Sequence, residues 1–307
     1  MDTREHPAVS APAPLMPGAI PPWIRTRVVE GENFKELKQL VNARRLHTVC
    51  EEAKCPNIFD CWSRRTATFM ILGDVCTRAC RFCAVTSGRP VELDIGEPLR
   101  VAESVAQLGL RHAVITSVDR DDLADGGAGM FARTIKAIRR RSPATTIEVL
   151  TPDFQGDLAA VQTVVEARPD IFNHNTETVP RLYARIRPKA VYANSLALLQ
   201  HVKRLAPEMV TKSGLMVGLG ETEDELLDVF RNMRAHDIDV LTVGQYLRPS
   251  KKHADVARYY RPEEFVQLKQ QAMELGFAHV EAGPMVRSSY HADEQVPVAS
   301  RKSLLAG

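Results

Sequence analysis

Apolar and polar positions follow a pattern whose period changes along the chain. Phe34, Leu37, Leu40 and Val41 form an apolar stripe that predicts a helix from residue 33 to about Leu46. Beyond it, short runs rich in β-branched residues and bounded by polar or helix-breaking residues predict strands. These strands span residues 67–72, 112–117, 145–150, 170–174, 210–217 and 238–243.

Helical patterns separate the predicted strands. One helix follows Pro98, another begins at the capping-box pair Thr222 and Glu225, and a third begins at Pro262, ahead of a short apolar run near Val280. Strands joined by helical crossovers pair in parallel with right-handed connections. The predicted fold is therefore an α/β sheet or partial barrel, open or closed, with its chemistry just after the carboxyl ends of the strands.

Composition adds few constraints. The 307 residues are 44% hydrophobic and 25% charged, as in an ordinary globular protein, and one domain is the default expectation. The net charge of +2 gives no general reason to expect a nucleic acid or membrane partner. No long apolar run or secretory signal is evident, so we expect a cytoplasmic protein. The proline-rich first 22 residues predict a flexible tail.

The cysteines carry the most specific signal. All six fall within 34 residues, in two triplets spaced C-x4-C-x5-C (Cys50, Cys55, Cys61) and C-x3-C-x2-C (Cys76, Cys80, Cys83). A disulfide framework suits small secreted domains, and structural zinc takes four ligands in repeated pairs; both remain as alternatives. Three thiolates on one loop can instead hold three irons of a [4Fe–4S] cluster and leave the fourth iron open to a small molecule.

The second triplet directly follows a predicted strand, and Phe82 precedes its last cysteine, which is similar to the signature of the radical S-adenosylmethionine superfamily. Over about residues 23 to 292 the chain resembles the lipoyl synthase family. The resemblance rests on HTVCEEAKCPNIFDCW (47–62), GDVCTRACRFCAV (73–85), TSVDRDDLADGGA (116–128), HNTETVPRLYARIRP (174–188), TKSGLMVGLGET (211–222), QYLRPS (245–250) and GPMVRSSYHA (283–292).

This resemblance implies a partial (β/α)6 TIM-like barrel at residues 67–282. A tail at 1–22 and an extension at 23–66 with the first cysteine triplet precede it, and a segment at 283–307 closes over an auxiliary cluster. The implied activity is insertion of two sulfur atoms at carbons 6 and 8 of a protein-bound octanoyl-lysine chain. The other interpretations are a different radical S-adenosylmethionine enzyme that inserts sulfur or transfers methylthio groups, and a non-catalytic zinc-binding protein.

The resemblance also implies two [4Fe–4S] clusters and S-adenosylmethionine as cofactors. The second triplet would bind the cluster that chelates S-adenosylmethionine and, once reduced, releases a 5′-deoxyadenosyl radical. The first triplet would hold the auxiliary cluster, which the family consumes as its sulfur source. Ser289 is the implied ligand of the fourth iron of that cluster; without the resemblance, Ser288 is an equal candidate and the pair is an ordinary turn.

Eight residues are candidate contacts for S-adenosylmethionine: polar residues and a glycine in or near the predicted strands, and Phe82 in the second cysteine loop. Each has a plainer interpretation: strand-end polar groups, a turn at the glycines, and for Glu148 a pairing inside the barrel. The candidates are Phe82, Thr116, Ser117, Glu148, Asn175, Glu177, Gly218 and Gln245.

The family's implied partners are octanoylated carrier domains, namely 2-oxoacid dehydrogenase E2 subunits and the glycine cleavage H protein. An electron donor such as flavodoxin or ferredoxin and iron–sulfur carrier proteins are also implied, with no nucleic acid or membrane. The basic segment with Arg248, Lys251 and Lys252 is either a contact for an acidic carrier domain or a solvated loop.

Overall fold

A computed structural model of the chain describes residues 20–25, 31–44, 46–52, 55 and 57–290. Residues 1–19 of the predicted tail and 291–307 of the predicted C-terminal segment lie outside the described residues. Within the described ranges, no helix combines the length and the apolar character needed to cross a membrane.

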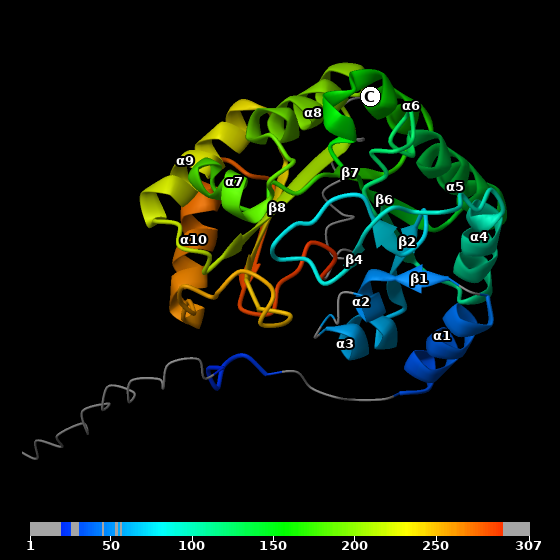
Figure 1. Cartoon of the computed structure of the whole chain (residues 1–307), viewed down its shortest axis with the longest axis horizontal. Coiled ribbons are helices and arrows are strands. Elements are labelled where there is room, and N and C mark those ends of the chain that lie inside the picture. The colour runs from blue at the N-terminus through cyan, green and yellow to red at the C-terminus, as the bar shows by residue number, and fades with distance from the viewer. Residues whose placement is uncertain (1–19, 26–30, 45, 53–54, 56, 291–307) are drawn as a thin grey trace, which may run out of the picture.

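One curved sheet dominates the fold (Figure 1). All neighbouring pairs from β2 to β10 are parallel, whereas β1 joins the edge of β2 in the antiparallel direction. In spatial order the strands are β1 (His47–Thr48), β2 (Thr66–Ile71), β5 (His112–Ser117), β6 (Thr146–Leu150), β7 (Ile171–Asn173), β8 (Val210–Val217), β9 (Val240–Gln245) and β10 (His279–Gly283). A separate short pair, β3 (Val75–Cys76) and β4 (Thr86–Ser87), lies in the loop after β2.

The predicted α/β partial barrel is confirmed, and β1 and β10 form the edges of an open sheet. The six predicted strands correspond to β2 and to β5 through β9. The short pair β3 and β4 was not predicted, and neither were two strands of the main sheet, β1 and β10. The run near Val280 forms β10, where Val280 alone is fully buried, and β1 is only two residues long. Neither has the repeated apolar pattern that identifies a strand from sequence.

Helices cover the outer face of the curved sheet, as Figure 1 shows. The capping box predicted at Thr222 and Glu225 is present, and the first helix ends at Ala43, earlier than the predicted Leu46. The main outer helices are α4 (Glu97–Gln107), α5 (Ala128–Arg141), α6 (Leu158–Glu166), α8 (Tyr192–Leu205), α9 (Glu223–Ala235) and α10 (Pro262–Glu274). Shorter helices lie at η1 (Phe154–Gly156), η2 (Pro180–Leu182) and α7 (Tyr183–Ile186).

The N-terminal extension lies along the open side of the barrel. It comprises α1 (Glu32–Ala43), α2 (Val49–Glu52) and α3 (Ile58–Ser63). Phe34 stacks on Phe59 with ring centroids 4.9 Å apart, and its ring lies 5.2 Å from that of the buried Trp62. Asn57 Nδ2 donates a hydrogen bond of 2.6 Å to the carbonyl of Met285, just beyond β10. The extension therefore connects the two edges of the sheet.

A buried charged group lies inside the barrel. Lys212 Nζ on β8 is 3.0 Å from Glu148 Oε1 on β6, and neither side chain is exposed. Asn173 Nδ2 donates to the same carboxylate at 2.8 Å, and His112 Nε2 lies 3.7 Å from it. Burial alone would raise the pKa of Glu148, but Lys212, His112 and Asn173 outweigh it and hold the pKa below its ordinary value. Glu148 thus has the structural role that the sequence left open.

Lys212→Met should destabilise the protein by about 3–5 kcal/mol, because it leaves the Glu148 carboxylate buried without a counter-charge. The urea unfolding midpoint of the variant measures this loss. Lys136→Met, on the exposed side of α5, is the matched control and should change stability by less than about 0.5 kcal/mol. Adding Glu148→Leu to Lys212→Met should recover much of the loss; equal midpoints for Lys212→Met and the control would contradict the pairing.

Candidate active site

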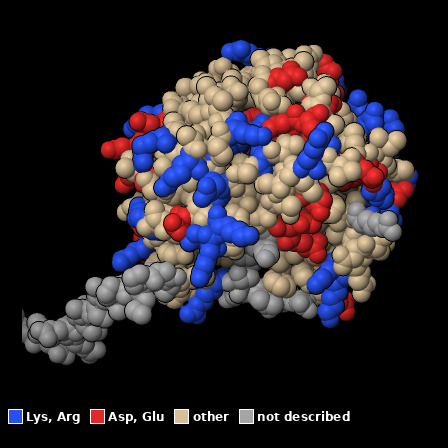
Figure 2. Space-filling model, viewed as in Figure 1, with Lys and Arg blue, Asp and Glu red and all other residues tan. Residues whose placement is uncertain are grey.

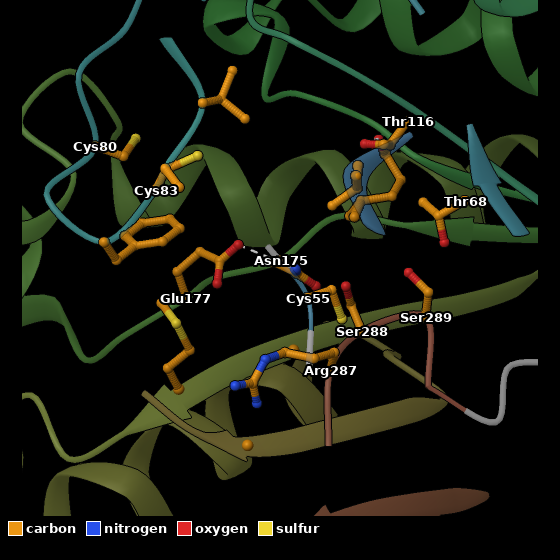
Figure 3. Close-up of a pocket in the computed structure, with 18 of the residues that line it drawn as sticks. Cys55, Thr68, Cys80, Cys83, Thr116, Asn175, Glu177, Arg287, Ser288 and Ser289 are labelled. Carbon is orange, nitrogen blue, oxygen red and sulfur yellow. Dashed lines mark hydrogen bonds between the residues drawn. The ribbon is translucent and has the colours of Figure 1, made fainter. Parts of the chain in front are cut away.

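All six cysteines line one cavity of about 550 Å³. The cavity lies at the carboxyl ends of the strands, where Thr116 and Ser117 end β5, Asn175 follows β7 and Gln245 ends β9. Parallel pairing brings these strand ends to one rim, as the sequence led us to expect. Figure 3 shows cysteines, strand-end residues and the C-terminal serines around the same space.

The loop that carries the second cysteine triplet is anchored to the barrel by Arg78. This guanidinium is almost fully buried, and its nitrogens lie 2.8 Å from Asp121 Oδ1 and 2.6 Å from Asp153 Oδ1. Asp119 adds a weaker contact at 3.4 Å, and the backbone N–H of Thr77 donates to the Asp119 carbonyl at 3.0 Å. The loops after β5 and β6 therefore hold the cysteine loop in position through these ion pairs and hydrogen bonds.

Burial keeps the thiols of this loop protonated in the absence of a metal. It raises the pKa of Cys80 to about 12 and that of Cys83 to about 11. The pKa of Cys76 is raised by burial and by Asp119, whose carboxylate lies 3.7 Å from the sulfur. Thiolates become stable in such a place when a metal centre supplies positive charge, so three adjacent sulfur donors fit an iron–sulfur cluster.

The first triplet occupies another part of the same cavity. Cys50 lies on α2, Cys61 on α3, and the backbone N–H of Cys55 donates to the Cys50 carbonyl at 3.0 Å. Burial and, to a smaller extent, the neighbouring cysteines together raise the pKa of Cys50 to about 12, and the same two causes raise the pKa of Cys61. Arg287 lowers the pKa of Cys55 in opposition to burial. As in the second triplet, these cysteines would become stable thiolates only when a metal centre supplies positive charge.

Among the described residues, no three His, Cys, Asp or Glu side chains converge as ligands of a single metal ion would. A four-iron cluster takes one thiolate at each iron, so its cysteines need not meet at one point.

Ser288 and Ser289 line the cavity together with the first triplet (Figure 3). They lie in the turn after β10, where the N–H of Tyr290 donates to the Arg287 carbonyl at 2.9 Å. The turn therefore brings both candidate fourth ligands to the cysteines from more than two hundred residues away.

Six of the eight predicted contacts for S-adenosylmethionine line the cavity: Phe82, Thr116, Ser117, Asn175, Glu177 and Gln245. Ser117 Oγ and Asn175 Oδ1 are buried without a hydrogen-bond partner among the described residues, so each has capacity for a ligand. Asn175 Nδ2 donates to Glu177 Oε1 at 3.1 Å, and Thr116 Oγ1 donates to the Leu150 carbonyl at 2.7 Å. Burial raises the pKa of Glu177.

Three of the eight predicted contacts, Glu148, Gly218 and Gln245, have structural roles. Glu148 lies in the barrel interior, bound to Lys212, and does not line the cavity. Gly218 does not line it either; it has a φ of +97°, and an added Cβ would lie 2.5 Å from the carbonyl oxygen of Arg258. Gln245 lines the cavity, but its amide nitrogen lies within hydrogen-bonding distance of three backbone carbonyls and its oxygen accepts the N–H of Tyr260. These roles depend on long-range contacts that sequence periodicity does not report.

The sequence analysis assigned no role to two cations of the cavity, Arg187 and Arg287. Arg187 is nearly buried, donates to the carbonyl of Asn175 at 3.0 Å, and lowers the pKa of Cys80 in opposition to burial. Arg287 acts in the same way on Cys55. Arg187 lies in the quoted segment 174–188 and Arg287 in the quoted segment 283–292. Their position inside these motifs is the signal that could have identified them from sequence. They supply positive charge where thiolates and carboxylates gather.

Comparison with known proteins agrees with this geometry. Residues 70–233 match the model of the radical SAM superfamily, and residues 17–55 match the N-terminal domain of lipoyl synthase. Lipoyl synthase of Rubrobacter xylanophilus is 59% identical over 92% of this chain and 88% of its own length. Lipoyl synthase of Bacillus subtilis is 57% identical over 92% of this chain and 95% of its own length.

The chain belongs to the lipoyl synthase family. It is accordingly a radical S-adenosylmethionine enzyme that inserts sulfur, and the family implies a [4Fe–4S] cluster and S-adenosylmethionine. The alternatives of a zinc-binding protein and of a different radical enzyme are thereby set aside. Lipoyl synthases act on lipoyl carrier proteins.

Solved structures share the fold at low sequence identity. Methylornithine synthase superposes with a TM-score of 0.53 and 13% identity, covering 91% of this chain and 90% of that one. Streptococcus suis SuiB bound to S-adenosylmethionine gives a TM-score of 0.55 and 10% identity, covering 81% of this chain and 56% of that one. At these identities the likeness concerns the fold alone.

Gly218→Ala should destabilise the protein far more than Gly220→Ala. Both glycines have positive φ, +97° and +106°, so both variants carry a backbone cost of about 1–2 kcal/mol. At Gly218 the new Cβ also meets the Gln245 amide and the Arg258 backbone, whereas at Gly220 nothing comes closer than 3.7 Å. Urea midpoints measure the difference. S-adenosylmethionine affinity of folded Gly218→Ala should stay near wild type; a selective loss of affinity with normal stability would make Gly218 a cofactor contact.

Proposed function

We propose that the cavity holds two [4Fe–4S] clusters around one substrate. In this proposal the chain inserts two sulfur atoms, at carbons 6 and 8 of an octanoyl chain attached to a carrier lysine. The observation that supports it is the shared cavity: both cysteine triplets, Ser288 and Ser289 line the same 550 Å³. A radical source and a sulfur source that face one space can act in turn on neighbouring carbons of one bound chain.

In the proposal, Cys76, Cys80 and Cys83 hold the catalytic cluster, whose fourth iron is open to S-adenosylmethionine. When bound and reduced, the pair supplies a 5′-deoxyadenosyl radical, which removes hydrogen from carbons that have no acidity. Ser117 and Asn175 have side-chain oxygen atoms at the cavity that no described residue bonds, and they are the strongest candidates to orient the cofactor, with Phe82, Thr116 and Glu177 as further contacts. Arg187 adjoins the same loop and offsets its negative charge.

Cys50, Cys55, Cys61 and Ser289 would bind the auxiliary cluster, which is consumed as the sulfur-donating substrate. Such a cluster must be stable at rest and able to lose iron when its sulfide bonds to carbon. An alkoxide is a harder ligand than a thiolate and is more easily protonated, so serine suits the iron that is released. Arg287, beside Ser288 in the same turn, would compensate the charge of the thiolates.

Apolar walls complement the proposed octanoyl substrate. They provide an environment for an alkyl chain and limit the water available to react with radical intermediates. The cavity lining includes Met70, Val118, Leu150, Met216, Leu247 and Val286.

We also propose the partner proteins of this chain and the roles of its segments. Octanoylated domains of 2-oxoacid dehydrogenase E2 subunits and the glycine cleavage H protein would deliver the substrate in the cytoplasm. Flavodoxin or ferredoxin would supply electrons, and iron–sulfur carriers would rebuild the auxiliary cluster. Residues 23–66 would form the extension, 67–282 the barrel and 283–307 the closing segment.

Incubation of the reconstituted protein with an octanoylated-lysine peptide, S-adenosylmethionine and dithionite tests the reaction. We expect the peptide to gain the mass of two sulfur atoms as the dithiol, and that mass less two hydrogens once the product is oxidised to the cyclic disulfide. Iron and sulfide analysis of the same preparation should give two clusters per chain. A fully active preparation that holds a single cluster would contradict the proposal.

Substitution of the second triplet should abolish cofactor cleavage, whereas substitution of the first should abolish only sulfur transfer. Alanine at Cys76, Cys80 or Cys83 should abolish formation of 5′-deoxyadenosine, because the open iron that chelates the cofactor is lost. Alanine at Cys50, Cys55 or Cys61 should leave cofactor cleavage measurable and prevent sulfur transfer. Chromatographic detection of 5′-deoxyadenosine and mass spectrometry of the peptide separate the two outcomes. Equal loss of cleavage in both sets, in folded protein, would refute this division.

Ser289→Ala should cleave S-adenosylmethionine yet transfer sulfur poorly under single-turnover conditions, because the releasable ligand is gone. Ser289→Cys should bind the auxiliary cluster at least as firmly and release iron more slowly. Ser288→Ala is the matched control, since it changes the neighbouring hydroxyl in the same turn, and it should retain transfer. If Ser288→Ala loses transfer and Ser289→Ala keeps it, the ligand is Ser288.

A further inference from the structure

A second recess, of about 230 Å³, is strongly basic. In Figure 2, Lys and Arg side chains gather on the part of the face that carries α7 and the segment after β9 in Figure 1. Its lining contains five cations and one acid, and the acid, Asp255, pairs with Arg248 at 2.6 Å. The lining residues are Arg81, Arg185, Arg248, Lys251, Lys252, His253, Ala254 and Asp255. This collection of charge requires an anionic partner or solvent ions.

Four of the five cations form no ion pair with another residue in the part of the chain that the structure describes. They are Arg81, Arg185, Lys251 and Lys252, and all four are exposed. Lys251 and Lys252 are held in place through their backbones, since the Lys251 carbonyl accepts from Arg248 at 2.6 Å and the N–H of Lys252 donates to Ser250 Oγ at 3.3 Å. Their side chains are thus available to a partner, and changing them leaves the loop's hydrogen bonds in place.

The recess is built directly onto the second cysteine loop. The N–H of Arg81 donates to the carbonyl of Ile186 in α7, and the carbonyl of Arg81 accepts from the N–H of Ala254, both at 2.8 Å. His253 Nε2 lies 2.9 Å from the carbonyl oxygen of Cys83. A partner seated on this recess would therefore be one hydrogen bond away from the backbone of a proposed cluster ligand.

The recess lies outside the substrate cavity, because the two linings have a single residue in common, Arg248. An octanoylated carrier has to deliver its alkyl chain into the cavity. A partner that needs only to come close to the cluster loop, without entering the cavity, has no such requirement. The position of the recess thus favours a partner that delivers electrons over one that delivers a chain.

We propose that this recess is the docking surface of an acidic one-electron donor protein. The inference rests on the proposed function, which requires reduction of the cluster held by Cys76, Cys80 and Cys83. The donor protein loses one electron and the cluster gains it, with no bond made or broken. Complementary charge would steer the donor to this face and orient its redox group toward the loop, and it would make binding weaker at high salt.

Titration of the reconstituted enzyme with flavodoxin, as the acidic donor, measures this binding directly. Lys251→Glu with Lys252→Glu should raise the Kd at low salt by about tenfold or more, because two attractions become repulsions. The salt dependence of the Kd should also become flatter. Arg133→Glu with Lys136→Glu, exposed on α5 away from the recess, changes the net charge equally and should alter the Kd by less than about twofold.

Cofactor cleavage separates docking from chemistry. With flavodoxin as donor, the Lys251 and Lys252 variant should form 5′-deoxyadenosine more slowly at limiting donor, while with dithionite its rate should equal that of the wild type. Equal Kd values for both double variants would overturn the proposal. So would a raised KM for an octanoylated carrier with an unchanged Kd for flavodoxin, which would assign the recess to the carrier. Failure of wild type to add sulfur with dithionite would contradict the proposed function, whereas the binding titration would still decide the docking surface.

Discussion

The parallel register of the sheet is the constraint on which the site depends. Because the strands from β2 to β10 all run in one direction, their carboxyl ends share one rim, and the loops that follow them meet there. The second cysteine triplet follows β2, Asn175 follows β7, and the serine turn follows β10. A cluster, a cofactor and a sulfur donor can be assembled in one cavity only if these segments end at the same side of the sheet.

Buried ion pairs hold the cysteine loop in place at that rim. The loop of the second triplet is tied to the barrel by Arg78, whose buried guanidinium binds Asp121 and Asp153 from two different loops. Such a buried charge is tolerable because each of its partners is close and hydrogen-bonded. The thiols above it have raised pKa values, and Arg187 partly opposes that rise at Cys80. The site is therefore arranged for ligands that become anionic when a metal binds.

Because the barrel is open, the N-terminal extension lies across the gap between the two edges of the sheet. The sheet does not close on itself: β1 and β10 are its edges, and α1 to α3 lie across the open side. The hydrogen bond from Asn57 to the Met285 carbonyl joins the first cysteine segment to the C-terminal turn. In the proposed function, substrate access and the auxiliary cluster would share this region, and the basic recess beside the cysteine loop would serve a partner that does not enter the cavity.

The sequence by itself determined the elements whose signals are local. Cysteine spacing identified both triplets, because ligands on one loop must be close in sequence, and periodicity identified β2, β5 to β9 and the capping box at Thr222. Only the tertiary structure decided which polar residues reach the cavity. Glu148 is paired with Lys212, 64 residues away, and Gln245 is occupied by backbone groups, whereas the side-chain oxygen atoms of Ser117 and Asn175 have no hydrogen-bond partner in the described part of the chain. Hydrogen-bond partners supplied by distant strands depend on the register of the sheet, which no local pattern encodes.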